Sequence, residues 1–326
     1  MNPPITPEQL VEALAEFEVQ EPPRALFRFH GPTAISALRH GCLRIRPPSE
    51  FNDPFELSPG IESERLTAAD LRRSFLAATS LPRQVFRPRF ADEPAYAQWV
   101  ENVVLGRHDL WGQHFTSMRA SVASAAAMWY GIACFSAFTE AELNGPLGIR
   151  HWAMYGRDHT GFALEFDPQH GLLSSWAASK WLFPVRYYDQ RPSVSIAEFD
   201  DWTEAKVTTV LRRWAEMKCR QAWGDEAEWR MICPLTPDAK NRVEISSAMI
   251  DGRKGYFLHL WKSGAPPGLR EGTLAIRRVI LGARIDPQVA AAVKEILSEP
   301  DFGHVKLERI ELCERNFALR TVEEQR

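Results

Sequence analysis

Features that mark a specialised protein class are scarce in this sequence. Its 326 residues include five cysteines, and no two of them are spaced as CxxC. This argues against a zinc ribbon or a dense disulfide framework and is typical of a reducing cytoplasm, the compartment that we predict. No run approaches the ~18 uncharged apolar residues of a membrane helix, so we expect no membrane partner. The N-terminus also lacks the basic and apolar regions of a signal peptide.

A charge excess and the common nucleotide motifs are missing as well. The 39 Lys and Arg against 42 Asp and Glu give a formal net charge of −3, which excludes nucleic-acid binding that rests on global positive charge. No GxGxxG follows a predicted strand, and there is no GxxxxGK[ST]. These absences argue against a Rossmann nucleotide site and a P-loop NTPase. What is present is an ordinary globular composition, 45% hydrophobic, that can bury a sizeable core.

Hydrophobic periodicity predicts an α+β protein with a mixed, mostly antiparallel split sheet and flanking helices. We expect a leader helix within 1–24, one main domain over 25–313 with a helical insertion at about 60–130, and a polar tail over 314–326. Strands and helices do not alternate regularly enough for a doubly wound parallel sheet. The main predicted strands are 25–30, 42–46, 131–136, 160–166, 226–233, 275–282 and 305–312, and the main predicted helices are 93–105, 196–221 and 286–299.

The first motif of interest is FNDPFE at 51–56. Asn and Asp side chains bond to their own backbone, and the proline fixes the next φ, so one interpretation is a rigid turn. The other is that Asn52, Asp53 and Glu56 face a cleft, where an amide and two carboxyls can bind sugar hydroxyls or a cation. The sequence leaves both interpretations open.

The second motif is HWAMY at 151–155, followed by His159. On a helix the first and last residues of the motif share a face, and a break after Tyr155 would place His159 in the next loop. The spacing does not match HExxH and no third ligand is evident, which argues against a metal site. Two interpretations remain: structural packing of Trp152 and Tyr155, or a ligand pocket with aromatic walls.

The third motif is EAEWR at 226–230. On a strand, Glu226, Glu228 and Arg230 would face one side, because side chains alternate with a period of two. One interpretation is an exposed ladder of charges at a sheet edge. The other is a glutamate that stabilises developing positive charge and is oriented by Arg230, and paired carboxylates beside tryptophans have a reason to carry shifted pKa values.

The fourth motif lies near the start of the chain, where Arg28 and His30 share one face of a predicted strand. A short helix follows, and helix N-termini favour anions, so this pair could hold a phosphate or a ribose. The alternative is a strand of mixed exposure. No Ser-His-Asp or Cys-His arrangement is recognisable, and Ser136 lacks a GxSxG context.

The order of these motifs resembles a bacterial family, domain of unknown function 2971 (DUF2971). The resemblance spans about residues 25–300. The sequence departs from the family pattern at His151, where the family tends to have Met, and over 60–130, which is not tightly patterned. The motifs that carry the resemblance are FRF at 27–29, NDPFE at 52–56, ACFS at 133–136, WAMY at 152–155, HTGFALEF at 159–166, VRYY at 185–188, WGDEAEWR at 223–230 and VILG at 279–282.

At the level of layout the chain is also similar to ADP-ribosyltransferases. In that superfamily a first-strand His or Arg contacts the ribose or phosphate of NAD, a central aromatic or Ser supports the nicotinamide pocket, and a late Glu stabilises an oxocarbenium-like transition state. The resemblance implies these roles for His30 or Arg28, for Tyr155 or Ser136, and for Glu228. A fixed carboxylate beside developing positive charge acts by electrostatic preorganisation.

We therefore predict an NAD-dependent ADP-ribosyltransferase-like enzyme, and the family resemblance extends this to a toxin or phage-defence effector. Its partners would be a small-molecule nucleotide, with NAD as substrate, and a protein or nucleic-acid acceptor. The predicted catalytic residues are Glu228, Tyr155 and Glu226. The predicted cofactor-binding residues are Arg28, His30, Ser136, Asn52, Asp53, Trp152, His159 and Arg230.

Two alternatives of a different class stay open. The first is a metal-dependent hydrolase or nuclease that uses Asp53, Glu56, His159 and Glu228 around a divalent cation. The second is a non-enzymatic binding module whose Trp-rich cleft captures a ligand.

Overall fold

The computed structural model describes residues 17–61, 67–78, 80–107, 130–178, 180–194, 204–235, 245–250, 253–261 and 270–326, and the single residues 111, 115, 117, 120 and 268. The chain divides into two compact units, each assembled from distant stretches of sequence. Unit 1 comprises Met1–Phe17, Pro48–Met128 and Arg186–Ala222, and unit 2 comprises Glu18–Pro47, Trp129–Val185 and Trp223–Arg326. Most of the predicted leader helix lies outside the described residues, and the predicted domain limits stay predictions. None of the helices in the described stretches is both long and apolar enough to span a bilayer.

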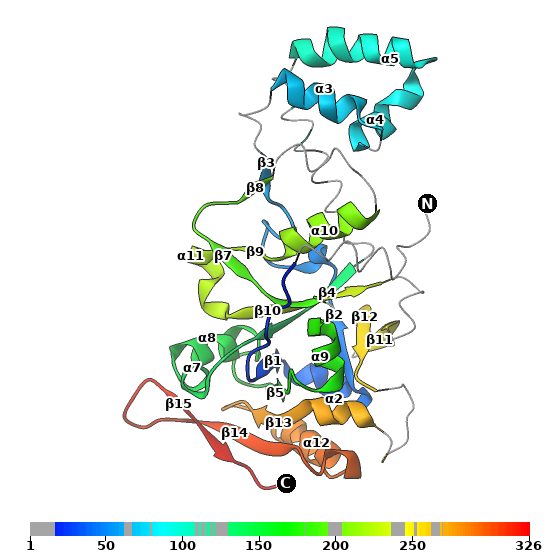
Figure 1. Cartoon of the computed structure of the whole chain (residues 1–326). Coiled ribbons are helices and arrows are strands. Elements are labelled where there is room, and N and C mark those ends of the chain that lie inside the picture. The colour runs from blue at the N-terminus through cyan, green and yellow to red at the C-terminus, as the bar shows by residue number, and fades with distance from the viewer. Residues whose placement is uncertain are drawn as a thin grey trace. The chain divides into compact units, whose positions relative to one another are not determined.

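Unit 2 is built on an eight-stranded sheet with the order β15-β14-β13-β5-β1-β4-β10-β6 (Figure 1). Neighbouring strands in it run antiparallel, except β13 and β14, which are parallel. This architecture confirms the predicted α+β class with a mixed, mostly antiparallel sheet; the likeness to ADP-ribosyltransferases stays a prediction. The strands are β1 (Leu26–His30), β4 (Tyr130–Ser136), β5 (Phe162–Phe166), β6 (Leu182–Pro184), β10 (Glu228–Pro234), β13 (Ile276–Leu281), β14 (Lys306–Leu312) and β15 (Leu319–Glu323).

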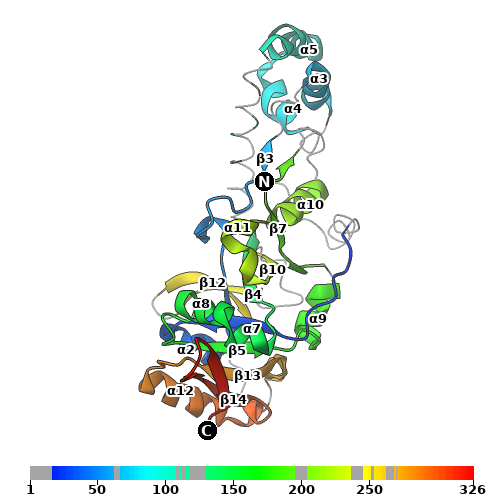
Figure 2. The same ribbon diagram turned by 90° about the vertical axis from the view of Figure 1, so that its left-hand side faces the viewer.

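The described residues of unit 2 also include a second, three-stranded sheet and several α-helices. The small sheet has the order β11-β12-β2. Helix α12 packs against α2, and the two are seen together in Figure 2. Local signals set several boundaries: Gly41 ends α2 with a φ of 63°, and the Asp286 side chain caps α12. The strands are β2 (Cys42–Ile45), β11 (Ile245–Ile250) and β12 (Arg253–His259), and the helices are α2 (Ile35–His40), α7 (Glu140–Asn144), α8 (Pro146–Met154), α9 (Gly171–Ala178) and α12 (Pro287–Leu297).

The eight-stranded sheet is covered on both faces. Because side chains alternate along a strand, Phe27 belongs to the core beneath α7 and α8, whereas its neighbour Leu26 belongs to the core shared with β2, β12, α9 and α12. We call these the α8 face and the β2 face. Register extends the assignment across the sheet: Phe27 lies opposite both Ser136 and Glu165, and Ser136 lies opposite Glu228, so all four belong to the α8 face.

Unit 1 contains the helices and short parallel strand pairs of the remaining chain. Thr67 and Asp70 form a capping box at the start of α3, because their side chains bond reciprocally to each other's backbone. Beyond it, Phe75, Tyr96 and Trp99 pack in one aromatic cluster. The elements are β3 (Gly60–Ile61), α3 (Ala68–Leu76), α4 (Leu81–Phe86), α5 (Glu93–Trp99), β7 (Arg186–Tyr188), β8 (Ser193–Val194), α10 (Glu204–Ala215), β9 (Met217–Cys219) and α11 (Arg220–Trp223).

Two local predictions need correction, and the polar tail contains a strand. The long helix predicted over 196–221 ends at Ala215, and the next residues form β9, which pairs with β7. The strand predicted from residue 226 begins at Glu228, because Gly224–Glu226 is a 3-10 turn and Ala227 has a φ of 44°. Part of the polar tail forms β15, which pairs with β14. In each case a tertiary strand pairing or a turn overrides the local hydrophobic period.

Candidate functional site

Polar side chains gather at the start of β10 on the α8 face. The β4–β10 register sets Glu228 opposite Ser136 and Arg230 opposite Cys134, so these four share one face of two neighbouring strands. Tyr155, the residue directly after α8, belongs to the same group of polar side chains. Ser136, Glu228 and Arg230 are buried, whereas Tyr155 is 38% exposed and links the group to solvent.

The Tyr155 hydroxyl donates a hydrogen bond to Oε1 of Glu226. Burial, above all, raises the pKa of Tyr155 above its ordinary value, and the carboxylates of Glu226 and Glu228 add to the effect because a phenolate would be repelled by them. Tyr155 therefore keeps its proton and acts as a fixed donor. Glu226, 7% exposed, reaches this position from the 3-10 turn before β10.

Glu228 and Arg230 form a buried ion pair two residues apart on β10. Arg230 Nε donates to Glu228 Oε1 at 2.8 Å, and Nη2 donates to Oε2 at 3.4 Å. The two side chains are 5% and 0% exposed. A guanidinium that binds both oxygens fixes the plane of the carboxylate as well as its charge. Two hydrogen bonds from Arg230 thus hold the Glu228 carboxylate in place.

Aromatic contacts hold the buried side chains of α8, next to Tyr155. The His151 ring lies 4.6 Å from the ring of Phe138 and 5.4 Å from that of Tyr155, and its Nδ1 is 3.1 Å from the Leu147 carbonyl. Trp152 is fully buried and packs edge-on against Phe29 at 5.0 Å. The contacts of Trp152 are those of the packing interpretation. No described contact joins Trp152 to Glu226 or Glu228.

The loop after α8 has an unusual backbone. Arg157, Asp158 and His159 have consecutive φ values of 51°, 57° and 66°, in the left-handed region that non-glycine residues seldom adopt. Gly161 follows because a Cβ there would lie 1.8 Å from the His30 carbonyl oxygen. His159 stacks on Trp152 with ring centroids 6.3 Å apart, and burial, with the charge of Arg284, lowers its pKa. Its described ring contact is therefore with Trp152 of α8.

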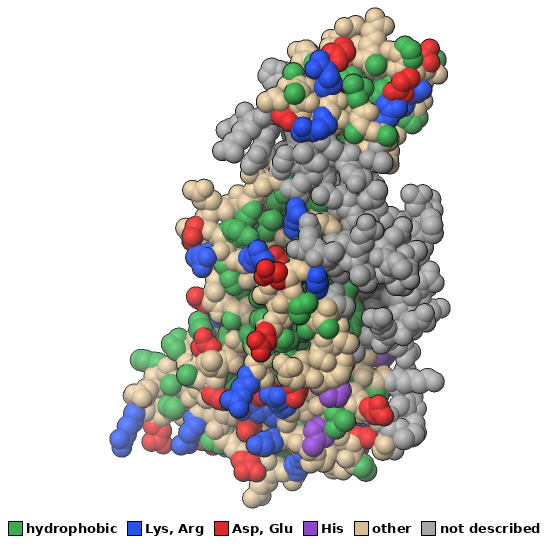
Figure 3. All heavy atoms as spheres, in the orientation of Figure 1, with side chains coloured by type: hydrophobic (Ala, Val, Ile, Leu, Met, Phe, Trp, Pro, Cys, Tyr) green, Lys and Arg blue, Asp and Glu red, His purple; other side chains and the backbone are tan. Residues whose placement is uncertain are grey.

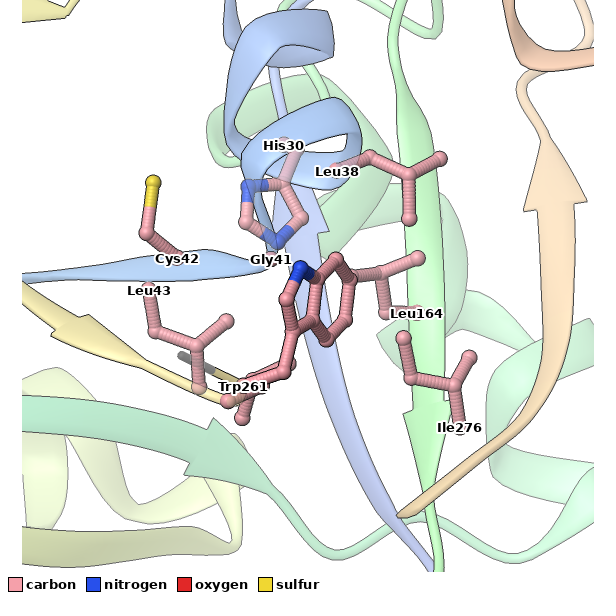
Figure 4. A pocket seen from close by; sticks show the side chains of 9 residues that line it. His30, Leu38, Gly41, Cys42, Leu43, Leu164, Trp261 and Ile276 are labelled. Atoms are coloured by element: carbon pink, nitrogen blue, oxygen red, sulfur yellow. The ribbon is translucent and has the colours of Figure 1, made fainter. Parts of the chain in front are cut away.

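Arg28 and His30 lie on the β2 face, opposite to Glu228. His30 stacks on Phe162 at 5.2 Å, and burial, reinforced by Arg28, lowers its pKa to about 3, so its ring is neutral. It faces a narrow apolar crevice beside Trp261 (Figure 4). Arg28 donates from Nη2 to the Arg44 carbonyl of β2. The structure thus places the two predicted NAD-contacting residues on the other side of the sheet from the predicted late glutamate.

The motif at 51–56 belongs to unit 1 and has the hydrogen bonds of a tight turn. Asp53 Oδ1 accepts from the Phe55 amide at 2.9 Å, and the Asp53 carbonyl accepts from the Glu56 amide at 3.1 Å. Asp53 is 5% exposed, whereas Asn52 is exposed. The ring of Phe55 lies 5.0 Å from the Arg191 guanidinium. These contacts are those of the rigid turn that the sequence offers as one interpretation.

Charged side chains of the described residues show no arrangement typical of a metal centre. No group of three or more His, Cys, Asp or Glu in the described residues is placed to hold a metal ion. On the face drawn in Figure 3, basic and acidic side chains of the described residues stand side by side. The described ion pairs include Arg150 with Asp225 at 2.8 Å, next to Glu226 in sequence.

Sequence reasoning missed Cys134 as a neighbour of the site. It lies opposite Arg230 and is near enough to contribute to the raised pKa of Tyr155. Both strands were predicted, but their relative register was not. The available signal was the pair Cys134 and Ser136, which lie two residues apart and share one face of a strand. This signal becomes informative only when β4 is known to pair with β10.

The comparison with known families bears on this segment. Residues 151–231 match the model of a family described as "Protein of unknown function (DUF2971)". No curated protein and no solved structure matches the chain. The matched segment holds Tyr155, Glu226, Glu228 and Arg230, and does not reach Arg28. The match confirms the family resemblance over residues 151–231.

Proposed function

We propose that this protein is an ADP-ribosyltransferase-like enzyme that uses NAD as substrate and carries out its chemistry at the start of β10. One observation supports this best: two carboxylates, Glu226 and Glu228, are buried two residues apart and held by different partners, a tyrosine and an arginine. Carboxylates in contrasting environments are how enzymes separate two roles between similar side chains.

The roles follow from the bond that has to break. The ribose–nicotinamide C–N bond cleaves, its electron pair leaves with nicotinamide, and positive charge develops on the ribose. Glu228, fixed in plane by Arg230, stabilises that charge in a water-poor site. The new bond forms between the ribose carbon and an acceptor oxygen or nitrogen, whose proton Glu226 takes as general base. Tyr155 and Arg230 act as positioning residues.

Ser136 belongs to the proposed reaction site, whereas Arg28 and His30 lie outside it. Ser136 stands directly opposite Glu228 on the neighbouring strand, so the two side chains share one face of the sheet. Arg28 and His30 face the β2 core. A toxin or defence role, with a protein or nucleic-acid acceptor, is the part of the proposal that rests on the family resemblance alone.

The test is nicotinamide release from NAD by the purified full chain, followed by chromatography. We expect wild-type turnover and, for Glu228→Gln, a loss of about 100-fold or more in kcat with NAD binding retained, because the lost interaction acts mainly in the transition state. Absence of wild-type turnover together with absence of NAD binding by calorimetry would contradict the proposal. Chelator-sensitive phosphoester cleavage would favour the hydrolase alternative instead, and NAD binding that is not followed by turnover would favour the binding module.

A further inference from the structure

The last strand of unit 2 forms one edge of its eight-stranded sheet. In the order of the described strands, β15 has β14 on one side and no further strand on the other (Figure 1). At the opposite edge, β6 spans three residues and includes Pro184, which has no backbone N–H to offer to a further strand. β15 spans five residues and contains no proline. Of these two edges, that of β15 is the better suited to pair with another strand.

The register of the β14–β15 pair shows which backbone groups of β15 point away from the sheet. The Glu324 amide donates to the Leu307 carbonyl at 3.0 Å. Hydrogen-bonded residues alternate with non-hydrogen-bonded ones along an antiparallel pair, so every second residue of β15 before Glu324 also bonds to β14. The residues between them direct their N–H and C=O groups outward. These are Leu319, Thr321 and Glu323.

Two apolar side chains beside this edge are unusually exposed. Phe317 and Leu312 are 99% and 63% exposed, the two largest values among the large hydrophobic residues that the structure describes. Both flank the turn that joins β14 to β15. Large apolar side chains in water beside an unpaired strand edge are typical of a surface that another protein covers.

The charges of β15 favour a second copy of the same strand as the partner. Arg320 lies near its start, with its side chain 67% exposed, and Glu323 and Glu324 lie at its end. When two copies run antiparallel, the basic end of each meets the acidic end of the other. In a parallel, in-register arrangement, like charges would stand side by side, which is destabilising.

The outward backbone groups restrict the register of such a pair. Residues whose N–H and C=O groups point outward must face one another across the new ladder. This condition is met when Val322 lies opposite Val322 of the second copy, because Thr321 then lies opposite Glu323. The same register places Arg320 directly opposite Glu324 of the second copy, so the backbone and the charges agree.

We propose that β15 pairs antiparallel with β15 of a second copy of this chain, so that two eight-stranded sheets join into one continuous sheet. The same patch serves both copies, as in a two-fold symmetric dimer. Thr321 of each copy and Glu323 of the other exchange both backbone hydrogen bonds. An interface of one strand from each copy is small, so we expect a dissociation constant of about 1–50 μM. The proposal concerns association alone and does not depend on the NAD chemistry.

The test is sedimentation equilibrium of the full chain from about 1 to 100 μM. Thr321→Pro is the variant of choice, because proline there removes an outward N–H and costs no bond to β14. Thr321→Val is the matched control, since it loses the same hydroxyl bond to Asn144 and keeps the N–H. We expect wild type and Thr321→Val to reach twice the chain mass of 37.1 kDa, and Thr321→Pro to stay monomeric.

A charge reversal tests the register independently. Arg320→Glu sets like charges opposite each other twice in the dimer, so we expect at least about tenfold weaker association. Arg89→Glu makes the same change at an exposed residue of unit 1 and should associate as wild type does.

Three results would overturn the proposal. A wild type that is monomeric at every concentration would assign the edge to a different protein partner. Dimerisation of Thr321→Pro with wild-type affinity would show that the outward N–H is not used. Urea unfolding establishes whether Thr321→Pro is folded, and if it is not, Arg320→Glu decides: wild-type affinity in that variant would contradict the pairing of β15 with itself.

Discussion

The two faces of the eight-stranded sheet differ in how their buried polar side chains are paired. On the α8 face, Glu165 pairs with Arg278 and Glu228 pairs with Arg230. On the β2 face, alternate residues of β1 leave buried nitrogens of Arg28 and His30 without a hydrogen-bond partner, and burial lowers the pKa of both. Buried charge on the α8 face is thus balanced by ion pairs, whereas on the β2 face burial disfavours the charged forms of Arg28 and His30.

A second contrast lies within the α8 face itself. Arg278 contacts three carboxylates from three elements: Glu165 of β5, Glu308 of β14 at 2.6 Å, and Glu140 of α7. It therefore links parts of the chain that are far apart in sequence. The Glu228–Arg230 pair joins two residues of one strand. The Arg278 network has an evident structural role. Comparing it with the Glu228–Arg230 pair therefore tests whether a buried ion pair serves the fold or the reaction.

The largest expected effect comes from breaking the Arg278 network. Arg278→Met leaves Glu165 buried without its cation, and we expect the free energy of unfolding to fall by about 3–5 kcal/mol. Urea unfolding of the full chain measures this. Arg309→Met, which removes a half-exposed arginine of neighbouring β14, is the control and should cost under about 1 kcal/mol. Equal losses in the two variants would contradict the structural role of the network.

A smaller effect should appear on the β2 face as a pH dependence. The pKa of His30 falls to about 3 on folding, so the unfolded chain binds a proton that the folded chain rejects between about pH 6.5 and 3. Stability contributed by neutral His30 is thus present above pH 6.5 and lost as pH falls, by about 3 kcal/mol between pH 7 and 4.

Urea unfolding at several pH values tests this through His30→Gln, which should flatten the pH dependence. Replacement of the exposed His40 by Gln should leave the wild-type slope unchanged. Parallel curves for wild type and His30→Gln would show that His30 does not titrate as the buried, neutral ring requires.

Removal of the Tyr155 hydroxyl should affect activity more than stability. Tyr155→Phe deletes the bond to Glu226, so we expect about 1 kcal/mol less stability and about tenfold slower nicotinamide release. Thermal unfolding and turnover, measured on one preparation, separate the two effects. Unchanged turnover would remove Tyr155 from the site.

The smallest effect is spectroscopic. Burial and two nearby carboxylates raise the pKa of Tyr155 above the ordinary value of about 10. Its contribution to stability is therefore present below pH 10 and lost as pH rises through the raised folded pKa. In an ultraviolet titration of the folded protein, wild type and Tyr155→Phe should release the same number of phenolic protons up to about pH 11. An extra proton released by the wild type near pH 10 would contradict the buried hydrogen bond.

Sequence pattern was sufficient to locate most strands and to draw attention to Tyr155, Glu228 and Arg230. It could not assign sheet faces, because a one-residue change of register moves every side chain of a strand to the other side. For that reason Arg28 and His30 were grouped with Glu228, although the β1–β4 pairing separates them. The position of Glu226 could not be predicted either, since a turn in which Ala227 has left-handed backbone angles breaks the two-residue period of the strand.

The most direct test of the central claim compares two buried glutamates on the same sheet face. Glu228→Gln and Glu165→Gln each remove one carboxylate charge beside an arginine, and both should lose stability in urea unfolding. Under conditions where both variants remain folded, nicotinamide release from NAD should fall by about 100-fold in Glu228→Gln and stay near wild type in Glu165→Gln. Equal activity in the two variants would show that Glu228, like Glu165, serves the fold and not the reaction.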